Sequence, residues 1–201
     1  MNKLIVIVGA SGAGKTTLAN ALAKKEKLDL ILEEHIERPF QELFKQDPKF
    51  ALANQLDYLI LRAEQEHQLR QGNLTTLMDG GLDLDFHGFT RLFHQHGWLN
   101  NAEFDLCKRF YSLTRSLLPP PDLIIAVSAS QQTISERLAS RSRINIASSE
   151  DAKLLSQYLE EWLENIPREK ILKLDVSGEG IEYSKSVQAI AEKLNQLRTT
   201  S

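Results

Sequence analysis

The sequence predicts an α/β fold in three layers, with a five-stranded parallel sheet flanked by helices. Two runs, residues 4–8 and 123–127, are continuously apolar, which is typical of strands buried on both faces. Stretches with strand and helix patterns alternate along the 201 residues. A glycine-rich stretch, residues 9–16, joins the first strand to the first helix. We therefore expect one domain, residues 1–201, with a full hydrophobic core.

Composition restricts the class of function. Charged residues make up 25% of the chain and the net charge is −3, which argues against binding nucleic acid through a basic face. Cys107 is the one cysteine, so the chain cannot form an internal disulfide framework. No apolar stretch is long enough to span a membrane. These features favour a cytoplasmic protein with small-molecule partners.

The first strand, residues 3–8, leads into a stretch that fits the Walker A pattern G-x-x-x-x-G-K-T. Glycines allow backbone N–H groups to surround phosphate oxygens, and the following helix, residues 15–27, directs its positive end at the same anion. The lysine can reach the β- and γ-phosphates, and the threonine hydroxyl can bind Mg²⁺. The motif predicts ATP and Mg²⁺ as cofactors, bound by Gly9, Ala10, Ser11, Gly12, Ala13, Gly14, Lys15, Thr16 and Thr17.

Acidic residues follow the next two predicted strands. Residues 28–33 form the second strand, after which comes Glu34, and residues 74–78 form the third, after which comes Asp79. The carboxyl ends of parallel strands form the crevice where open α/β sheets bind ligands. We expect Glu34 to act in the site, the alternative being a solvated loop. Asp79 is a candidate ligand of Mg²⁺ or of its water.

A short helix at residues 39–44 and a long helix at 47–70 precede the third strand. The long helix is expected to bury an apolar stripe that includes Ile60. Gln55 and Arg62 are two helical turns apart, so they point the same way. They are either a pair of ligand contacts or two polar residues on a solvent-exposed face of the helix.

The second half of the chain continues the alternation. Helices are expected at residues 83–96, 101–118, 130–140, 148–165 and 184–197, and strands at 122–127 and 170–174. Asn100 is the expected cap of the helix at 101–118, which should bury Leu117 among other apolar residues. His87, His94 and His96 fit no standard zinc spacing with Cys107, and we expect them to be ordinary helix-surface residues.

Three arginines cluster near the end of the helix at residues 130–140. Arg137, Arg141 and Arg143 lie at the helix end and in the loop beyond it. Guanidinium groups suit phosphate recognition, and a loop that closes over a triphosphate excludes water and neutralises charge. This predicts a lid at residues 137–147. The alternative is a solvated basic helix end.

Taken together, these motifs resemble the deoxynucleoside kinases over nearly the whole chain. The resemblance rests on the phosphate loop, Glu34-His35-Ile36, Arg38-Pro39-Phe40, the pair Gln55 and Arg62, Asp79, Asp85, Pro121-Asp122-Leu123-Ile124-Ile125, and the lid arginines. It implies a P-loop kinase fold and transfer of the γ-phosphoryl of ATP to a deoxynucleoside 5′-hydroxyl. The implied catalytic residues are Glu34 as general base, Lys15, Arg137 and Arg141. The implied acceptor contacts are Glu34, Phe44, Gln55, Arg62 and Asp85.

Several positions depart from the family pattern. Gly80 and Gly81 stand where the family has arginine and serine, and Phe44 stands where a tyrosine contacts the sugar. Ile146 replaces a glutamate, and His35 replaces a proline. Each lost charged partner typically costs ~1.5–3 kcal/mol of binding. Two or three such losses would cripple the usual reaction of the family unless the site binds a different acceptor, and Arg38, Arg62 and Arg91 are the candidates to replace the charge missing at residue 80.

Three functions remain open at this point. The first is an ATP-dependent kinase, most simply for a deoxynucleoside, although a nucleoside, a monophosphate or another hydroxyl compound would also fit. The second is a weakly catalytic nucleotide-binding subunit that pairs with an active kinase, which the departures favour. The third is a switch NTPase, for which we identify neither a water-positioning residue nor a switch. The resemblance also implies a homodimer, with a heterodimer as the alternative.

Overall fold

The computed structural model describes residues 3–26, 28–31, 38–139 and 149–199. Within these ranges five parallel strands form one sheet in the order β2-β3-β1-β4-β5, as the alternation of patterns predicts. Their bounds are β1 Leu4–Val8, β2 Asp29–Ile31, β3 Thr76–Asp79, β4 Leu123–Ser128 and β5 Ile171–Asp175. The central strand β1 pairs Ile7 with Asp79 of β3, so this aspartate lies beside the start of the glycine-rich stretch.

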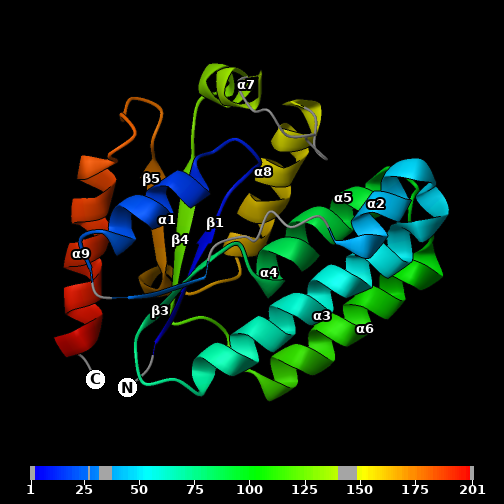
Figure 1. Ribbon diagram of the computed structural model, residues 1–201, viewed down its shortest axis with the longest axis horizontal. Helices are drawn as coiled ribbons and strands as arrows, with labels where there is room; N and C mark the ends of the chain where they lie inside the picture. Colours follow the sequence, from blue (N-terminus) through cyan, green and yellow to red (C-terminus); the bar gives the residue numbers. More distant parts are fainter. Residues whose placement is uncertain (1–2, 27, 32–37, 140–148, 200–201) are drawn as a thin grey trace.

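Helices cover both faces of the sheet, which gives the three predicted layers (Figure 1). On one face, α1 (Lys15–Ala23) and α9 (Ser184–Thr199) enclose a core of aliphatic side chains that includes Ile5, Leu22 and Ile190. On the other face, α8 (Ser149–Leu163) packs residues such as Trp162 on the strands. Both sides of β1 are therefore buried, which explains its uninterrupted apolar sequence.

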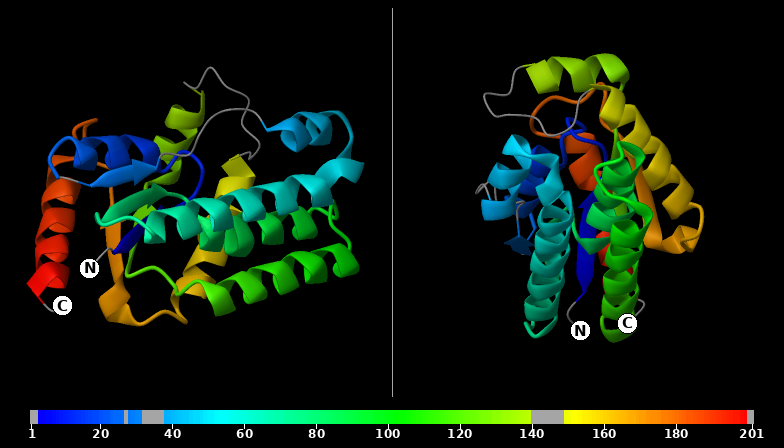
Figure 2. Two further views of the ribbon diagram at one scale, coloured as in Figure 1. Left: turned by 60° about the horizontal axis from the view of Figure 1, so that its bottom comes forward. Right: turned by 90° about the vertical axis from the view of Figure 1, so that its right-hand side faces the viewer.

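A second group of helices extends beyond α8. It comprises α2 (Pro39–Gln46), α3 (Ala51–Arg70), α4 (Leu82–Leu84), α5 (Arg91–Gln95) and α6 (Asn101–Leu117). Figures 1 and 2 show α3 and α6 side by side along most of their length. Helix α7 (Gln131–Ala139) lies at the opposite side of the molecule, beyond the carboxyl end of β4 (Figure 1).

Two expected helices differ in detail from the structure. The region 83–96 is not one regular helix, because a π-helical segment, Asp85–Thr90, separates α4 from α5. The helix after the phosphate loop ends at Ala23, four residues before the predicted end. Asn100 does cap α6, and its side chain and that of Glu103 form a reciprocal capping box.

Some expected burial is wrong. Leu117 is 73% exposed and Ile60 is 43% exposed, although both were expected to be buried. The buried side of α3 is largely polar and carries Asn54, Gln55, Arg62 and Glu66. Hydrophobic periodicity is misleading in such a helix, because its inward face serves a polar cluster. None of the helices within the described ranges is long and apolar enough to cross a bilayer.

Candidate active site

The phosphate loop has the geometry that its sequence predicts. Gly14 has a φ of 102° and caps α1, a left-handed conformation that favours glycine. A Cβ atom at Gly9 would lie 2.4 Å from the carbonyl oxygen of Val127, so only glycine fits between β1 and β4. The Lys15 ammonium donates to the carbonyl of Ala10 at 3.3 Å and is held over the loop. This loop presents backbone N–H groups and a lysine at the start of a helix, as an anion site requires.

Thr16 and Asp79 meet at the carboxyl ends of β1 and β3. The Thr16 hydroxyl donates to the Asp79 carboxylate at 2.5 Å, and the Asp79 side chain is fully buried. Hydroxyl and carboxylate oxygens are the donor types that Mg²⁺ prefers. Both predicted metal residues therefore fit a magnesium ion at this edge of the sheet.

Arg137 approaches the same loop from α7. Its Nη1 donates to the carbonyl of Ala13 at 2.7 Å. Its guanidinium also lies over the ring of Tyr183, with 5.8 Å between the guanidinium carbon and the ring centroid. A Cβ at Gly14 would lie 2.3 Å from the Tyr183 hydroxyl oxygen. The loop is thus bordered by one predicted cation and by a tyrosine that the sequence analysis missed.

A buried polar cluster holds three of the predicted acceptor residues. Arg62 forms an ion pair with Asp85 at 3.0 Å, and their side chains are 3% and 9% exposed. The Thr90 hydroxyl lies 3.1 Å from the side-chain oxygen of Gln55 and 2.9 Å from the carbonyl of Asp85. The alternative of a solvent-exposed face for Gln55 and Arg62 is therefore wrong. We call Gln55, Arg62, Asp85 and Thr90 the acceptor cluster.

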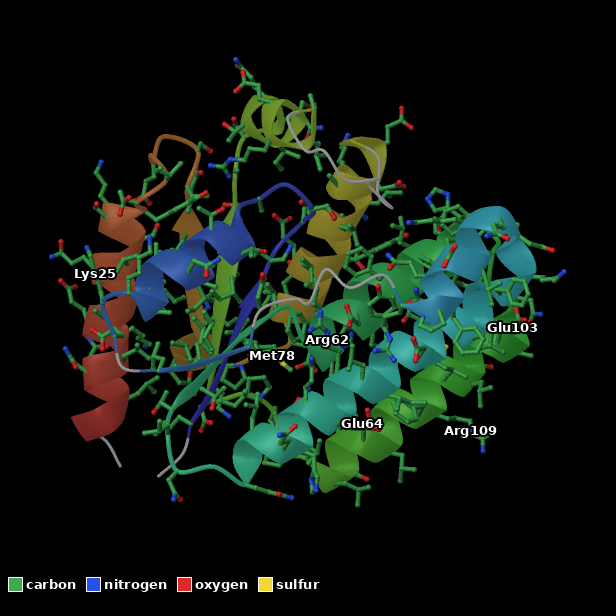
Figure 3. All side chains as sticks on the ribbon, in the orientation of Figure 1. Lys25, Arg62, Glu64, Met78, Glu103 and Arg109 are labelled. Carbon is green, nitrogen blue, oxygen red and sulfur yellow. The ribbon has the colours of Figure 1, made fainter. Side chains whose placement is uncertain are left out.

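Arg62 also lies beside Gly80. A Cβ built on Gly80 would be 3.4 Å from Arg62 Nη2. Figure 3 shows Arg62 on the side of α3 that faces the sheet, whereas Glu64 points outward. The other two candidate arginines are engaged elsewhere: Arg38 binds Asp57, and Arg91 binds Glu161. Arg62 is thus the one of the three whose charge lies next to residue 80.

The remaining site predictions lie outside this arrangement or outside the described residues. Phe44 packs among aromatic side chains, with ring centroids 4.8 Å from Phe93 and 5.1 Å from Trp98. Glu34, Arg141, Arg143 and Ile146, with most of the predicted lid at 137–147, lie outside the described residues.

The three histidines have separate partners. His87 bonds the Tyr111 hydroxyl at 3.0 Å and stacks on Trp162, His94 bonds Asn101, and His96 bonds Asp151. Burial, aided by the nearby charges of Arg91 and Arg115, lowers the pKa of His87 to about 4. The expectation of a helix-surface residue is wrong for His87.

Three charged residues behind the acceptor cluster were not predicted from the sequence. Arg115 on α6 forms hydrogen bonds with both Glu66 on α3 and Asp83 on α4. No sequence motif identifies these residues, because they lie on separate helices and come together only in the folded chain. The nearest signal is their position: Glu66 is one turn after Arg62, and Asp83 is two residues before Asp85.

Comparison with known proteins places this geometry in a family. The family model for deoxynucleoside kinases matches residues 5–198. The chain belongs to the deoxynucleoside kinase family. Membership makes it an ATP-dependent phosphotransferase and confirms the resemblance seen in the sequence.

Individual relatives agree with this assignment. The chain is 33% identical to deoxyadenosine kinase of Dictyostelium discoideum, over 69% of this chain and 57% of that protein. It is 27% identical to deoxyguanosine kinase of Bacillus subtilis, over 96% of both chains. The fold resembles that of deoxyadenosine kinase from M. mycoides with bound dATP, with a TM-score of 0.79 and 23% identity over 95% of this chain and 98% of that one.

Proposed function

We propose that this deoxynucleoside kinase family member transfers the γ-phosphoryl of ATP to the 5′-hydroxyl of a deoxynucleoside. One observation carries the proposal: the phosphate loop and the acceptor cluster form a continuous line of contacts. Thr16 bonds Asp79, the next residue is Gly80, Arg62 lies against Gly80, and Arg62 pairs with Asp85. A donor and an acceptor bound at the two ends of this line would meet near Gly80.

The donor end supplies charge and position. Lys15 and Arg137 would contact the phosphates of ATP, and Thr16 and Asp79 would hold Mg²⁺, which neutralises phosphate charge when bound. Phosphoryl transfer depends mainly on alignment and on fixed positive charge around the transferring group. Loop N–H groups and Lys15 are fixed before the nucleotide arrives, because the loop is supported by β1, β4 and α1.

The acceptor end supplies recognition. Gln55 would read the edge of the base, while Arg62 and Asp85 would hold the base and sugar between α3 and the π-helical segment. Arg62 would also supply the positive charge that Gly80 lacks. We assign Glu34 as the general base for the 5′-hydroxyl, an assignment that rests on the sequence resemblance. Two relatives are a deoxyadenosine kinase and a deoxyguanosine kinase, which makes these two purine deoxynucleosides the first acceptors to test.

A screen of acceptors tests the proposal. Purified protein with Mg²⁺-ATP is assayed for ADP release with each of the four common deoxynucleosides, their ribonucleoside forms and their monophosphates. We expect a deoxynucleoside to give the highest kcat/KM. Lys15→Ala should abolish turnover, whereas Lys25→Ala, an exposed lysine just beyond the same helix, should leave it unchanged.

The outcomes separate this function from the alternatives. Tight ATP binding with no turnover on any acceptor would contradict the proposal and favour the nucleotide-binding subunit, which the phenylalanine at residue 44 also motivates. ATP hydrolysis at the same rate with and without an acceptor would favour an NTPase.

We further propose that a second copy of this chain covers the outer face of α6. Leu106, Leu113 and Leu117 are 42%, 59% and 73% exposed, and their spacing of seven and four residues places them on one side of the helix. Ile60 on the adjacent α3 is 43% exposed. Light scattering should give a dimer, and Leu113→Glu should give a monomer, with Ile181→Glu as a control on another exposed apolar residue. A monomeric wild-type chain would contradict this.

A further inference from the structure

A buried charge cluster ties together the helices behind the acceptor cluster. Arg115 of α6 contacts both oxygens of Glu66, at 2.8 and 2.9 Å, through two nitrogens of its guanidinium. The same guanidinium contacts both oxygens of Asp83, each at 2.9 Å. The side chains of Glu66 and Asp83 are 1% and 6% exposed. One guanidinium thus holds two buried carboxylates in a fixed geometry.

Both carboxylates are close in sequence to residues of the acceptor cluster. Glu66 follows Arg62 by one turn of α3, so the two side chains lie on the same face of that helix. Asp83 precedes Asp85 by two residues, where α4 runs into the π-helical segment. Arg115 therefore joins the two segments that bring Arg62 and Asp85 together, through Glu66 and Asp83.

A second residue of α6 supports the same segment. The Tyr111 hydroxyl donates to Asp83 at 2.8 Å, and its ring stacks on that of Phe86 with centroids 4.2 Å apart. Phe86 is the residue after Asp85. The face of α6 that carries Tyr111 and Arg115 thus holds the chain on both sides of Asp85.

Charge and geometry together fix the position of Arg115 between Glu66 and Asp83. The planar guanidinium has two edges that can each bind a carboxylate, and a lysine ammonium has no such fork. Burial alone would lower the pKa of Arg115, but the carboxylates of Asp83 and Glu66 outweigh this and raise it. Without the arginine, two buried carboxylates would face each other and the segments would separate or admit water.

We propose that Arg115 is a positioning residue for acceptor binding: by bridging Glu66 and Asp83 it sets the distance between Arg62 and Asp85. This inference rests on the proposed function. It assigns Arg115 no contact with either substrate. Removing its fork should weaken binding of the deoxynucleoside much more than binding of ATP, because the phosphate loop rests on other elements.

The test compares Michaelis constants for the two substrates. In Arg115→Met, the KM for the best acceptor should rise about tenfold or more, whereas the KM for ATP should stay within about twofold. Arg115→Lys keeps the charge without the fork, and its acceptor KM should rise in the same direction. Calorimetric titration of the nucleoside in the absence of ATP should show the same loss of affinity.

Arg70→Met is the matched control. Arg70 also binds Glu66, at 2.8 Å, but it bonds the carbonyls of Pro119 and Pro120 where Arg115 bonds Asp83. It should lower the thermal midpoint while leaving the acceptor KM unchanged. This control separates loss of stability from loss of positioning, because both variants disturb the same glutamate.

The results separate failure of the positioning role from failure of the kinase function. The positioning role would be overturned if Arg115→Lys had the same acceptor KM as the wild type. It would also be overturned if the KM for ATP and the KM for the acceptor rose equally in the Arg115 variants. Either result would leave the kinase function intact. An equal rise of acceptor KM in Arg70→Met would overturn it as well. A wild-type chain that phosphorylates no nucleoside would remove the proposed function and this inference together.

Discussion

Arg62 is the residue on which the candidate acceptor site most depends. Arg62 forms an ion pair with Asp85, contacts Gln65 at 3.2 Å and lies beside Gly80. Only 2% of the residue is exposed to solvent. The sequence identifies Arg62 through its spacing from Gln55, but it does not show that the side chain fills the place beside Gly80. That placement depends on α3 lying close to the residue after β3, which only the fold provides.

Replacing Arg62 tests this position. In Arg62→Met, Asp85 would lose its buried ion pair with Arg62, and the missing charge beside Gly80 would not be supplied. Truncating one member of such a pair costs about 2–5 kcal/mol, so we expect kcat/KM for the acceptor to fall by about 30-fold or more. Steady-state kinetics would measure this. The idea fails if Arg62→Met turns over the acceptor like the wild type.

His87 makes stability depend on pH. Its pKa is lowered from 6.5 to about 4 in the folded chain, so the unfolded chain binds more protons between these values. The contribution of His87 to the free energy of unfolding is therefore fully present above pH 6.5 and is lost as the pH falls toward 4. Between pH 7.5 and pH 5 this group contributes a loss of about 2 kcal/mol.

Urea unfolding at several pH values would measure this effect. His87→Gln keeps a hydrogen-bonding group beside Tyr111 but cannot take up the proton. The difference between the two pH profiles isolates His87 from the carboxylates that also titrate. Parallel profiles for the wild type and His87→Gln would show that the histidine is not shielded from protons as described.

At the level of elements, sequence periodicity predicts regular segments well and irregular ones poorly. The five strands and the capped helix α6 follow from apolar runs and from Asn100. The π-helical segment at Asp85–Thr90 does not, because such segments are rare and have no hydrophobic period of their own in the sequence. In this segment the Thr90 hydroxyl reaches both Gln55 and the carbonyl of Asp85. Thr90, the member of the acceptor cluster that was not predicted, therefore lies where the helix is irregular.

The capping box at the start of α6 offers a test at the same scale. Asn100→Ala removes the side-chain acceptor for the backbone N–H of Glu103, at 3.0 Å, and should reduce the free energy of unfolding by about 1 kcal/mol. Its acceptor KM should not change, since Arg115 lies at the other end of the helix. Lys108→Ala, an exposed residue of the same helix, serves as the control in chemical denaturation. Equal stability of Asn100→Ala and the wild type would contradict the capping role.

In the whole molecule, the sheet and the outer helices contribute different parts of the candidate site. The sheet with α1 carries the phosphate loop, and the outer helices α3 to α6 carry the acceptor cluster and Arg115 (Figures 1 and 2). The phosphate loop could be predicted from the sequence because the Walker A pattern is contiguous, whereas Tyr183 beside it carries no motif. The acceptor side could be predicted only through resemblance, since Gln55, Arg62 and Asp85 are scattered in the chain and Glu66, Asp83 and Arg115 carry no motif.

The most direct test of the central claim is the identity of the product. Purified chain is incubated with Mg²⁺-ATP labelled at the γ-phosphate and with deoxyadenosine or deoxyguanosine, and the labelled species are separated and identified by mass spectrometry and ³¹P NMR. We expect a deoxynucleoside 5′-monophosphate that forms in equal amount to ADP. Label that appears only as inorganic phosphate, or no release of ADP with these two acceptors or with deoxycytidine and thymidine, would contradict the proposed function.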